Sequence, residues 1–217
     1  MFILNLHGIG TPRRELPASE QKVWIEDSQF LQILDYVKAR SDVDLTFDDA
    51  NESDFTIALP ALQSRGLKAR FFIVAERIGS PAFLAPSQLH SLRGAGMALG
   101  NHGMRHRRWV GLDNGELHEE LVEARDRLEQ LAGVKIDQAS CPFGSYNRRV
   151  VRALRGAGYS AIYTSDRGPA QSGALILPRN TVHRTWELEN IQAILTRQPK
   201  GARRIWRNLK LVLKRWR

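Results

Sequence analysis

The sequence of 217 residues contains a single cysteine, Cys141, and no long apolar run. One cysteine excludes an internal disulfide framework and is typical of a reducing compartment. A membrane-spanning helix needs about 18 consecutive apolar residues, and no stretch reaches that length. The first residues also lack the basic flank and the cleavage site of a secretory signal. We therefore expect a cytoplasmic protein.

Acidic residues are missing from one end of the chain. Residues 200–217 contain eight lysines and arginines and no acid, so the other 199 residues carry only +1 of the net charge of +9. No Gly/Pro/Ser-rich linker divides those 199 residues, which also lack internal repeats. The sequence therefore predicts one nearly neutral domain over residues 1–199 and a basic tail over residues 200–217.

The tail has the periodicity of an amphipathic helix. At 100° per residue, one third of its circumference collects Ile205, Trp206, Leu209, Val212, Leu213 and Trp216. A basic helix with tryptophans on its apolar side is typical of the surface of an anionic membrane, which would place the protein on the inner face. Packing of the tail on the domain is an alternative. Nucleic-acid binding is disfavoured because the domain itself is nearly neutral.

Short β-rich segments alternate with helical ones along residues 1–199, which predicts an α/β fold with a parallel sheet. About seven strands in this length favour a distorted or incomplete (β/α) barrel. The expected strands are Phe2–Leu6, Val43–Phe47, Ala69–Val74, Met97–Leu99, Ala161–Thr164 and Leu175–Leu177. The expected helices are Asp27–Arg40, Ser53–Ser64, Pro86–Arg93, Asn114–Leu131, Asn147–Arg155 and Trp186–Leu195.

Polar clusters fall at the carboxyl ends of these strands, where parallel α/β folds bind their ligands. They are His7, the pair Asp48-Asp49, the pair His102 and His106, and the turn over residues 142–147. The fold prediction places all four clusters on one rim.

Two of these clusters suggest a metal site. Adjacent carboxylates such as Asp48 and Asp49 repel each other, and a divalent cation bound by one of them removes the penalty. His102 and His106 are four residues apart, so on one face of a helical turn both could reach the same ion. Such an ion polarises a carbonyl and lowers the pKa of a bound water to about 7, leaving the second aspartate as base. A turn-forming Asp pair and a surface or core pair of histidines are the structural alternatives.

The sequence here resembles a known family in three ordered motifs. Thr46-Phe47-Asp48-Asp49-Ala50, the stretch from Gly100 to His106, and Cys141-Pro142-Phe143-Gly144-Ser145-Tyr146-Asn147 are similar to motifs of the polysaccharide deacetylases. These form the NodB-homology domain, carbohydrate esterase family 4. The similarity covers roughly residues 1–185.

The resemblance implies the family's distorted (β/α) barrel and a role for each matching residue. Asp49, His102 and His106 would bind zinc, with cobalt or another divalent ion as alternatives, and Asp48 would be the base. The Phe143 N–H would donate to the oxyanion. The sugar would contact His7, Pro142, Phe143, Gly144, Tyr146 and Asn147, although His7 could equally be structural.

The chain departs from the family pattern at two places. Many members carry an arginine before the proline of the third motif, where this chain has Ala139-Ser140-Cys141. Arg179 is therefore the candidate to orient Asp48. The family's late Leu-x-His motif has no clear match, and His183 is the nearest candidate for the general acid, with an exposed loop histidine as the alternative.

The second motif also lies among three arginines, Arg105, Arg107 and Arg108. They could bind an anionic substrate such as a sugar phosphate, or they could pair with surface acids.

Together these residues predict a metal-dependent hydrolase that removes the N-acetyl group from a sugar of a surface polysaccharide or a lipid-linked glycan. The alternatives are a deformylase or other C–N hydrolase on the same scaffold, and a non-catalytic, membrane-docked glycan-binding protein.

Overall fold

A computed structural model describes residues 1–196. Within them, no helix is both long enough and apolar enough to cross a membrane. The predicted amphipathic helix of residues 200–217 lies outside the described residues, and so does the predicted domain boundary.

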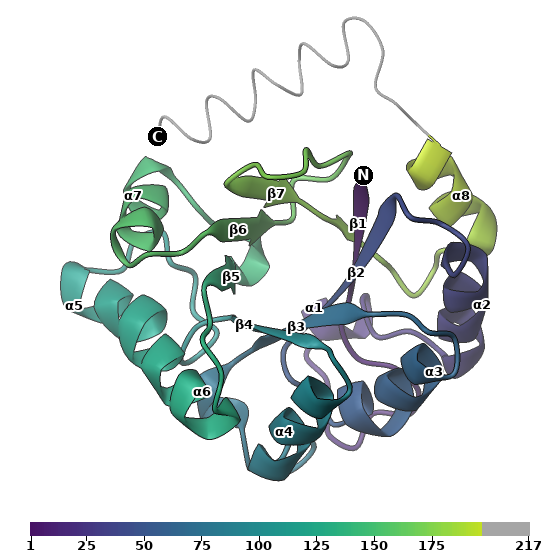
Figure 1. Ribbon diagram of the computed structural model, residues 1–217, viewed down its shortest axis with the longest axis horizontal. Coiled ribbons are helices and arrows are strands. Elements are labelled where there is room, and N and C mark those ends of the chain that lie inside the picture. The colour runs from purple at the N-terminus through teal and green to yellow at the C-terminus, as the bar shows by residue number, and fades with distance from the viewer. Residues whose placement is uncertain (197–217) are drawn as a thin grey trace, which may run out of the picture.

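Eight parallel strands form a single sheet in the order β7-β6-β5-β4-β3-β2-β1-β8. Their bounds are β1 (Phe2–Leu6), β2 (Val43–Asp48), β3 (Ala69–Ile73), β4 (Ala98–Asn101), β5 (Gln138–Ser140), β6 (Ala161–Thr164), β7 (Ile176–Pro178) and β8 (Asn180–Thr181). The sheet curls into a nearly closed barrel with helices around its outside (Figure 1). The predicted distorted (β/α) barrel is confirmed, with eight strands instead of about seven.

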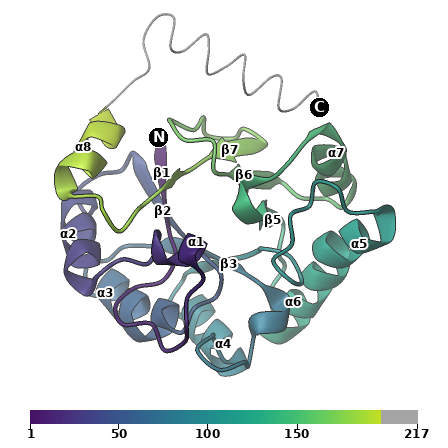
Figure 2. The ribbon, with the colours of Figure 1, turned by 180° about the vertical axis from the view of Figure 1, so that it is seen from behind.

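Most of the helices connect successive strands and cover the outer face of the sheet, and α8 follows the last strand. They are α1 (Ala18–Gln21), α2 (Asp27–Val37), α3 (Leu59–Gln63), α4 (Pro86–Gly94), α5 (Asn114–His118), α6 (Ala124–Ala132), α7 (Arg148–Gly156) and α8 (Leu188–Thr196). Two π-helical segments join them: η1 (Asp54–Ala58) precedes α3, and η3 (Glu119–Glu123) links α5 to α6. Two short 3₁₀ segments, η2 (Ala75–Arg77) and η4 (Pro142–Gly144), follow β3 and β5. Seen from behind, α1 and its loop lie in front of the barrel, on the side of the carboxyl ends of the strands (Figure 2).

Side chains alternate along each strand, as the period of two requires. Leu4, Phe47 and Phe71 belong to the large core between the sheet and the helices. Their neighbours Ile3 and Phe72 belong to a separate cluster with Tyr163 from β6, which is the interior of the barrel. The same inward alternation places Asn5, Thr46, Asp48 and Ser140 nearer the carboxyl ends, and all four are buried. The barrel interior is therefore apolar in its middle and polar below the rim.

The barrel closes at Arg179. This residue lies between β7, which pairs with β6, and β8, which pairs with β1. Its backbone N–H donates to Thr164 O of β6 at 2.9 Å, and Val182 N donates to Asn5 O of β1 at 2.9 Å. One short stretch of chain thus crosses from one edge of the sheet to the other, and it carries an arginine at the junction.

Candidate functional site

The predicted site residues come from six segments of chain that meet at the carboxyl ends of the strands. His7 follows β1, Asp48 ends β2 and Asp49 follows it. His102 and His106 follow β4, Phe143 is in η4 after β5, Arg179 joins β7 to β8, and His183 follows β8.

The three predicted metal ligands converge. Ligand atoms of Asp49, His102 and His106 all lie within 4.8 Å of one another. Asp49 Oδ1 is 3.2 Å from His106 Nε2 and 3.8 Å from His102 Nε2. The predicted helical turn is wrong, however, because residues 102–107 form a loop. Gly103 has φ 90° and His106 has φ 57°, and these left-handed conformations turn the second imidazole toward the first.

Both imidazoles are in the state that a metal ligand requires. His102 Nδ1 is 2.8 Å from Ser140 O, a pure acceptor, so Nδ1 carries the proton and Nε2 presents its lone pair. Burial lowers the pKa of His106 to about 3, even though the Asp49 charge opposes the shift. Burial lowers the pKa of His102 as well. Both rings are therefore neutral at neutral pH.

Asp49 offers an acceptor that the protein leaves without a donor. Its Oδ1 is buried and has no hydrogen-bond partner among the described residues. Arg77 Nη1 approaches Oδ1 at 3.0 Å but donates to the Asp49 backbone oxygen at 3.3 Å. Arg77 thus supplies a positive charge near Oδ1 but no hydrogen bond to it, so a lone pair of this buried oxygen stays available for a cation. The donor set Asp49, His102 and His106 therefore fits a divalent ion such as Zn²⁺.

Asp48 is clamped by Arg179 through two parallel hydrogen bonds. Arg179 Nη1 donates to Asp48 Oδ1 and Nη2 donates to Oδ2, both at 2.7 Å. Asn5 Nδ2 donates to Oδ2 at 3.1 Å. Burial opposes ionisation of Asp48, but the neighbouring charges, above all that of Arg179, hold its pKa well below its usual range. Asp48 is thus a fixed carboxylate, with Oδ2 3.7 Å from His102 Nε2.

Arg179 is held as firmly as the aspartate it contacts. It is fully buried, and it also donates to Asn5 Oδ1 at 2.7 Å and to Ser140 Oγ at 2.6 Å. Arg179 thus orients Asp48 from the segment between β7 and β8, and Ser140, from the segment that lacks the arginine of many family members, accepts a hydrogen bond from the same guanidinium.

The turn of the third motif brings Phe143 next to the histidines. Phe143 has φ 57°, its ring centroid is 4.5 Å from that of His106, and 51% of its surface is exposed. Its backbone N–H makes no hydrogen bond within residues 1–196. The N–H is therefore available as a donor at the rim.

The other residues of this turn that were predicted to contact the sugar are buried or make hydrogen bonds within the protein. Tyr146 is 2% exposed and its hydroxyl donates to Asp166 Oδ2 at 2.6 Å. Asn147 Oδ1 accepts from Val150 N at 3.0 Å and caps α7. Pro142 and Gly144 are buried. These residues shape the turn, and Phe143 is its most exposed member.

His7 and His183 lie side by side at the junction of β1 and β8. The register pairs Asn5 with Thr181, so two residues further on the two histidines follow adjacent strands. Burial, together with the charge of Arg167, lowers the pKa of His183, and its ring packs against Trp186 with centroids 5.0 Å apart. His7 Nδ1 is buried without a hydrogen-bond partner among the described residues. His183 was the predicted general acid, and the structure places a second histidine, His7, next to it at the end of the adjacent strand.

Glu120 was missed by the sequence reasoning, although it organises the histidine loop. This side chain is fully buried and accepts hydrogen bonds from Met104 N at 3.0 Å, Arg105 N at 3.1 Å and Trp109 Nε1 at 3.3 Å. A Cβ at Gly103 would lie 2.1 Å from Glu120 Oε2. The sequence did contain a signal for a buried glutamate, because Glu120 precedes Leu121 on the apolar side of the predicted helix.

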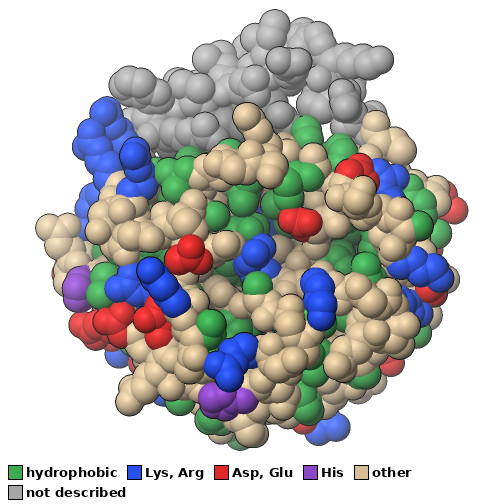
Figure 3. All heavy atoms as spheres, in the orientation of Figure 1, with side chains coloured by type: hydrophobic (Ala, Val, Ile, Leu, Met, Phe, Trp, Pro, Cys, Tyr) green, Lys and Arg blue, Asp and Glu red, His purple; other side chains and the backbone are tan. Residues whose placement is uncertain are grey.

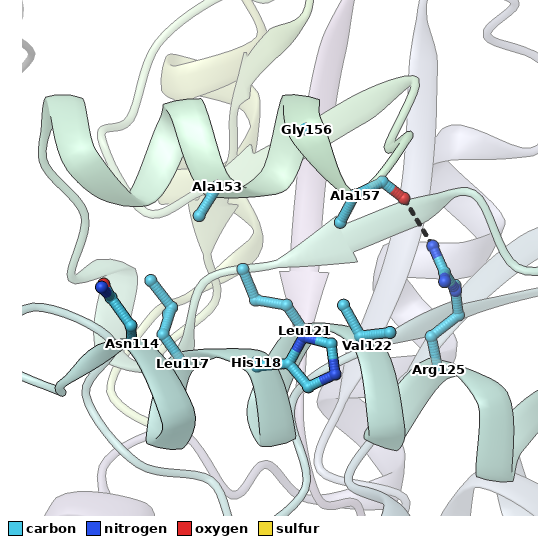
Figure 4. A pocket seen from close by; sticks show the side chains of 9 residues that line it. All are labelled: Asn114, Leu117, His118, Leu121, Val122, Arg125, Ala153, Gly156 and Ala157. Atoms are coloured by element: carbon cyan, nitrogen blue, oxygen red, sulfur yellow. Dashed lines mark hydrogen bonds between the residues drawn. The ribbon is translucent and has the colours of Figure 1, made fainter.

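A groove of about 510 Å³ lies elsewhere, on the outside of the barrel between α7 and the helix of residues 114–132 (Figure 4). Leu117, Leu121 and Ala153 line it, and Arg125 closes one end by donating to Ala157 O. This groove lacks the converging carboxylates and imidazoles of the rim, so the rim is the candidate active site.

Known proteins share both the sequence pattern and the fold. The profile of the polysaccharide deacetylase family matches residues 36–162, more than half of the chain. YxkH of Bacillus subtilis, which carries the name of that family, is 25% identical over 126 residues, 58% of this chain and 45% of YxkH. YheN of the same organism is 34% identical over 103 residues, 46% of this chain and 35% of YheN. The chain thus spans less than half the length of these curated relatives.

The fold is also that of a solved deacetylase. The Streptococcus pyogenes deacetylase PplD, in complex with acetate, superposes with a TM-score of 0.79 at 21% identity, covering 92% of this chain and 98% of that one. The rim geometry, the family profile and this likeness agree, and the chain belongs to the polysaccharide deacetylase family.

Proposed function

We propose that this protein is a metal-dependent carbohydrate N-deacetylase that releases acetate from an N-acetylated sugar. The observation that carries the proposal is the convergence of Asp49, His102 and His106 on one point beside the clamped carboxylate of Asp48. Hydrolysis of an acetamide adds water across the C–N bond and yields acetate and an amine. PplD was solved with acetate bound, which is the acid product of such a reaction.

Asp49, His102 and His106 would hold the divalent ion. When bound, the ion supplies Lewis acidity, which polarises the acetyl carbonyl and favours ionisation of water. Zn²⁺ suits one carboxylate and two neutral imidazoles, and Co²⁺ is an alternative for the same ligands.

The chain itself supplies the proton transfers. Asp48 accepts the proton of the attacking water, and Arg179 holds both of its oxygens in place. The Phe143 N–H donates to the oxygen that becomes negative when the carbonyl carbon turns tetrahedral, and the fixed turn needs no rearrangement to do so. His183, or His7 beside it, gives a proton to the leaving amine.

Acetate release tests this function. Purified protein is assayed on a panel of N-acetylhexosamines with chelator, and then with Zn²⁺ or Co²⁺ restored. We expect release only with metal, and a loss of at least about 100-fold in His106→Ala, because several kcal/mol of stabilisation disappear with a ligand. His90→Ala, which changes an exposed histidine on α4, is the matched control.

Release that persists in the metal-free protein would contradict the proposal. Formate in place of acetate, from the corresponding formamido sugars, would instead assign the deformylase alternative.

We further propose a cytoplasmic location at the membrane, with a surface polysaccharide or lipid-linked glycan as substrate. Support comes from the composition of residues 200–217, with eight cations and no acid. Cosedimentation of the full chain with anionic and neutral vesicles tests this. We expect binding to the anionic vesicles alone, lost on truncation after residue 196, and equal sedimentation of both forms would contradict it.

A further inference from the structure

The three arginines around the second motif differ in what they contact. Arg105 Nε is 2.9 Å from Glu76 and its Nη2 is 2.8 Å from Glu119. Arg107 Nη2 is 2.7 Å from Glu116. These two cations are neutralised by the surface acids next to them.

Arg108 has no carboxylate partner among residues 1–196. Its guanidinium carbon lies 4.5 Å from the centroid of the Phe143 ring, and the other neighbour of that ring is His106, with centroids 4.5 Å apart. The exposed Phe143 ring is therefore a shared neighbour of the Arg108 guanidinium and of the His106 imidazole.

The contact with Phe143 orients the guanidinium without using its N–H donors. A cation over an aromatic face is held through the ring quadrupole, and the N–H groups at its edge are not used. The same fork matches the two oxygens of a carboxylate or a phosphate. Arg108 is thus an exposed cation without a carboxylate partner among the described residues. The ring that it contacts, Phe143, also contacts His106 of the candidate metal site.

Two more cations without a carboxylate partner in the described chain belong to the same rim. Lys22 follows α1, and Arg167 lies in the loop after β6, where its backbone N–H donates to Arg179 O at 3.1 Å. Their charges act on His183, whose pKa they help to lower. On the opposite side of the barrel, basic and acidic side chains are interspersed (Figure 3). Lys22 and Arg167 therefore add positive charge near His183, on the same rim as Arg108.

We propose that Arg108, stacked on Phe143, anchors a subsite for an anionic group, a phosphate or a carboxylate, attached to the sugar that is deacetylated. The inference rests on the proposed function and makes it more specific, because the preferred substrate is then an acidic glycan and not a neutral one. A sugar phosphate and a glycan with a uronate next to the acetylated sugar both carry such a group.

The test compares three substrates of similar size: N-acetylglucosamine 1-phosphate, a glucuronate–N-acetylglucosamine disaccharide, and the neutral methyl glycoside of N-acetylglucosamine. We expect the native protein to favour at least one anionic substrate in kcat/KM by about 10-fold, the effect of one charge-assisted bidentate contact. Arg108→Gln should remove that preference, Arg108→Lys should keep part of it, and added salt should weaken it. The anionic substrate whose advantage in kcat/KM disappears in Arg108→Gln shows whether the subsite binds a phosphate or a carboxylate.

Arg152→Gln is the matched control, because Arg152 is an exposed cation on α7 with no acidic partner in the described residues. An equal loss in Arg152→Gln, or an unchanged preference in Arg108→Gln, would overturn the proposal.

Binding of N-acetylglucosamine 1-phosphate to the chelated protein, followed by calorimetry, separates the two proposals. Binding that depends on Arg108, with no acetate released after Zn²⁺ is restored to the same protein, would support the subsite and contradict the proposed function. Binding that is the same in Arg108→Gln would overturn the subsite, whatever the activity.

Discussion

Arg179 and Asp48 form a buried ion pair in which each charge depends on the other. Arg179 is fully buried and makes both of its contacts with Asp48 at 2.7 Å. Removing one member of such a pair leaves an uncompensated charge in the interior, which costs more than the pair contributes. The clamp that orients the proposed base is therefore also a condition for a stable barrel.

We expect Arg179→Met to lower the free energy of unfolding by about 3–5 kcal/mol. Urea unfolding of the chelated protein measures this, with Arg152→Met as the control, for which a surface change should cost less than about 0.5 kcal/mol. Equal midpoints for the two variants would show that the buried charge is compensated by some other group.

Asp54 is a second buried carboxyl group, and it has the opposite character. Neither of its oxygens has a hydrogen-bond partner among the described residues. Burial, together with the charges of Asp49 and Asp48, raises the pKa of Asp54 well above its usual value. It is therefore protonated in the folded protein at a pH where the unfolded chain has already lost the proton.

The sign of the linkage follows from this raised pKa. Between the unfolded and the folded pKa the native state binds one more proton, so stability falls by up to about 1.4 kcal/mol per pH unit as the pH rises. Asp54→Asn removes this titration. We expect the melting temperature of the variant, relative to the native chain, to improve steadily above pH 4 in chelated protein. An advantage that does not change with pH would contradict the assignment.

At the scale of elements, the sequence predicted the strands whose apolar residues build the core. It missed β5 and β8, which are three and two residues long. Their inward side chains serve the polar layer below the rim, as Ser140 does, so neither strand carries an apolar run. Short polar strands next to a site are invisible to hydrophobic periodicity.

The prediction that His102 and His106 lie together is confirmed, but the predicted secondary structure around them is wrong. Spacing by four suggested a helical turn, whereas a loop with two left-handed residues brings the rings to a centroid separation of 4.9 Å. That loop is set by Glu120 from the π-helical segment η3, a contact between residues that no local pattern connects. The family motif predicted that the two histidines act together, whereas the conformation of their loop depends on the tertiary contact with Glu120.

We expect Glu120→Gln to weaken metal binding about 10- to 100-fold, the usual effect of removing support behind a ligand. The amide would present a donor to backbone N–H groups that now donate to a carboxylate. Zn²⁺ affinity by competition with a chromophoric chelator measures this. Glu123→Gln, an exposed change in the same segment, should leave the affinity unaltered, and an equal loss in both variants would refute a specific role for Glu120.

At the scale of the whole molecule, the parallel barrel brings together residues from position 7 to position 183. Every strand ends on the same rim, so the fold class alone predicted which clusters would meet. It could not predict that Arg179 reaches Asp48 across the barrel, because that contact arises where the sheet edges join between β7 and β8. The sequence suggested Arg179 only because the usual arginine of the third motif is missing. Its place between β7 and β8 explains how its side chain reaches Asp48.

The central claim is that Asp49, His102 and His106 jointly bind one divalent ion, and calorimetric titration of Zn²⁺ into chelated protein tests it most directly. We predict one ion per chain for the native protein, with binding lost in His106→Ala and retained in His90→Ala. Binding should also raise the free energy of unfolding by about 2.7 kcal/mol at a free Zn²⁺ concentration 100 times the dissociation constant. Equal stoichiometry and affinity in native protein and His106→Ala would contradict the account.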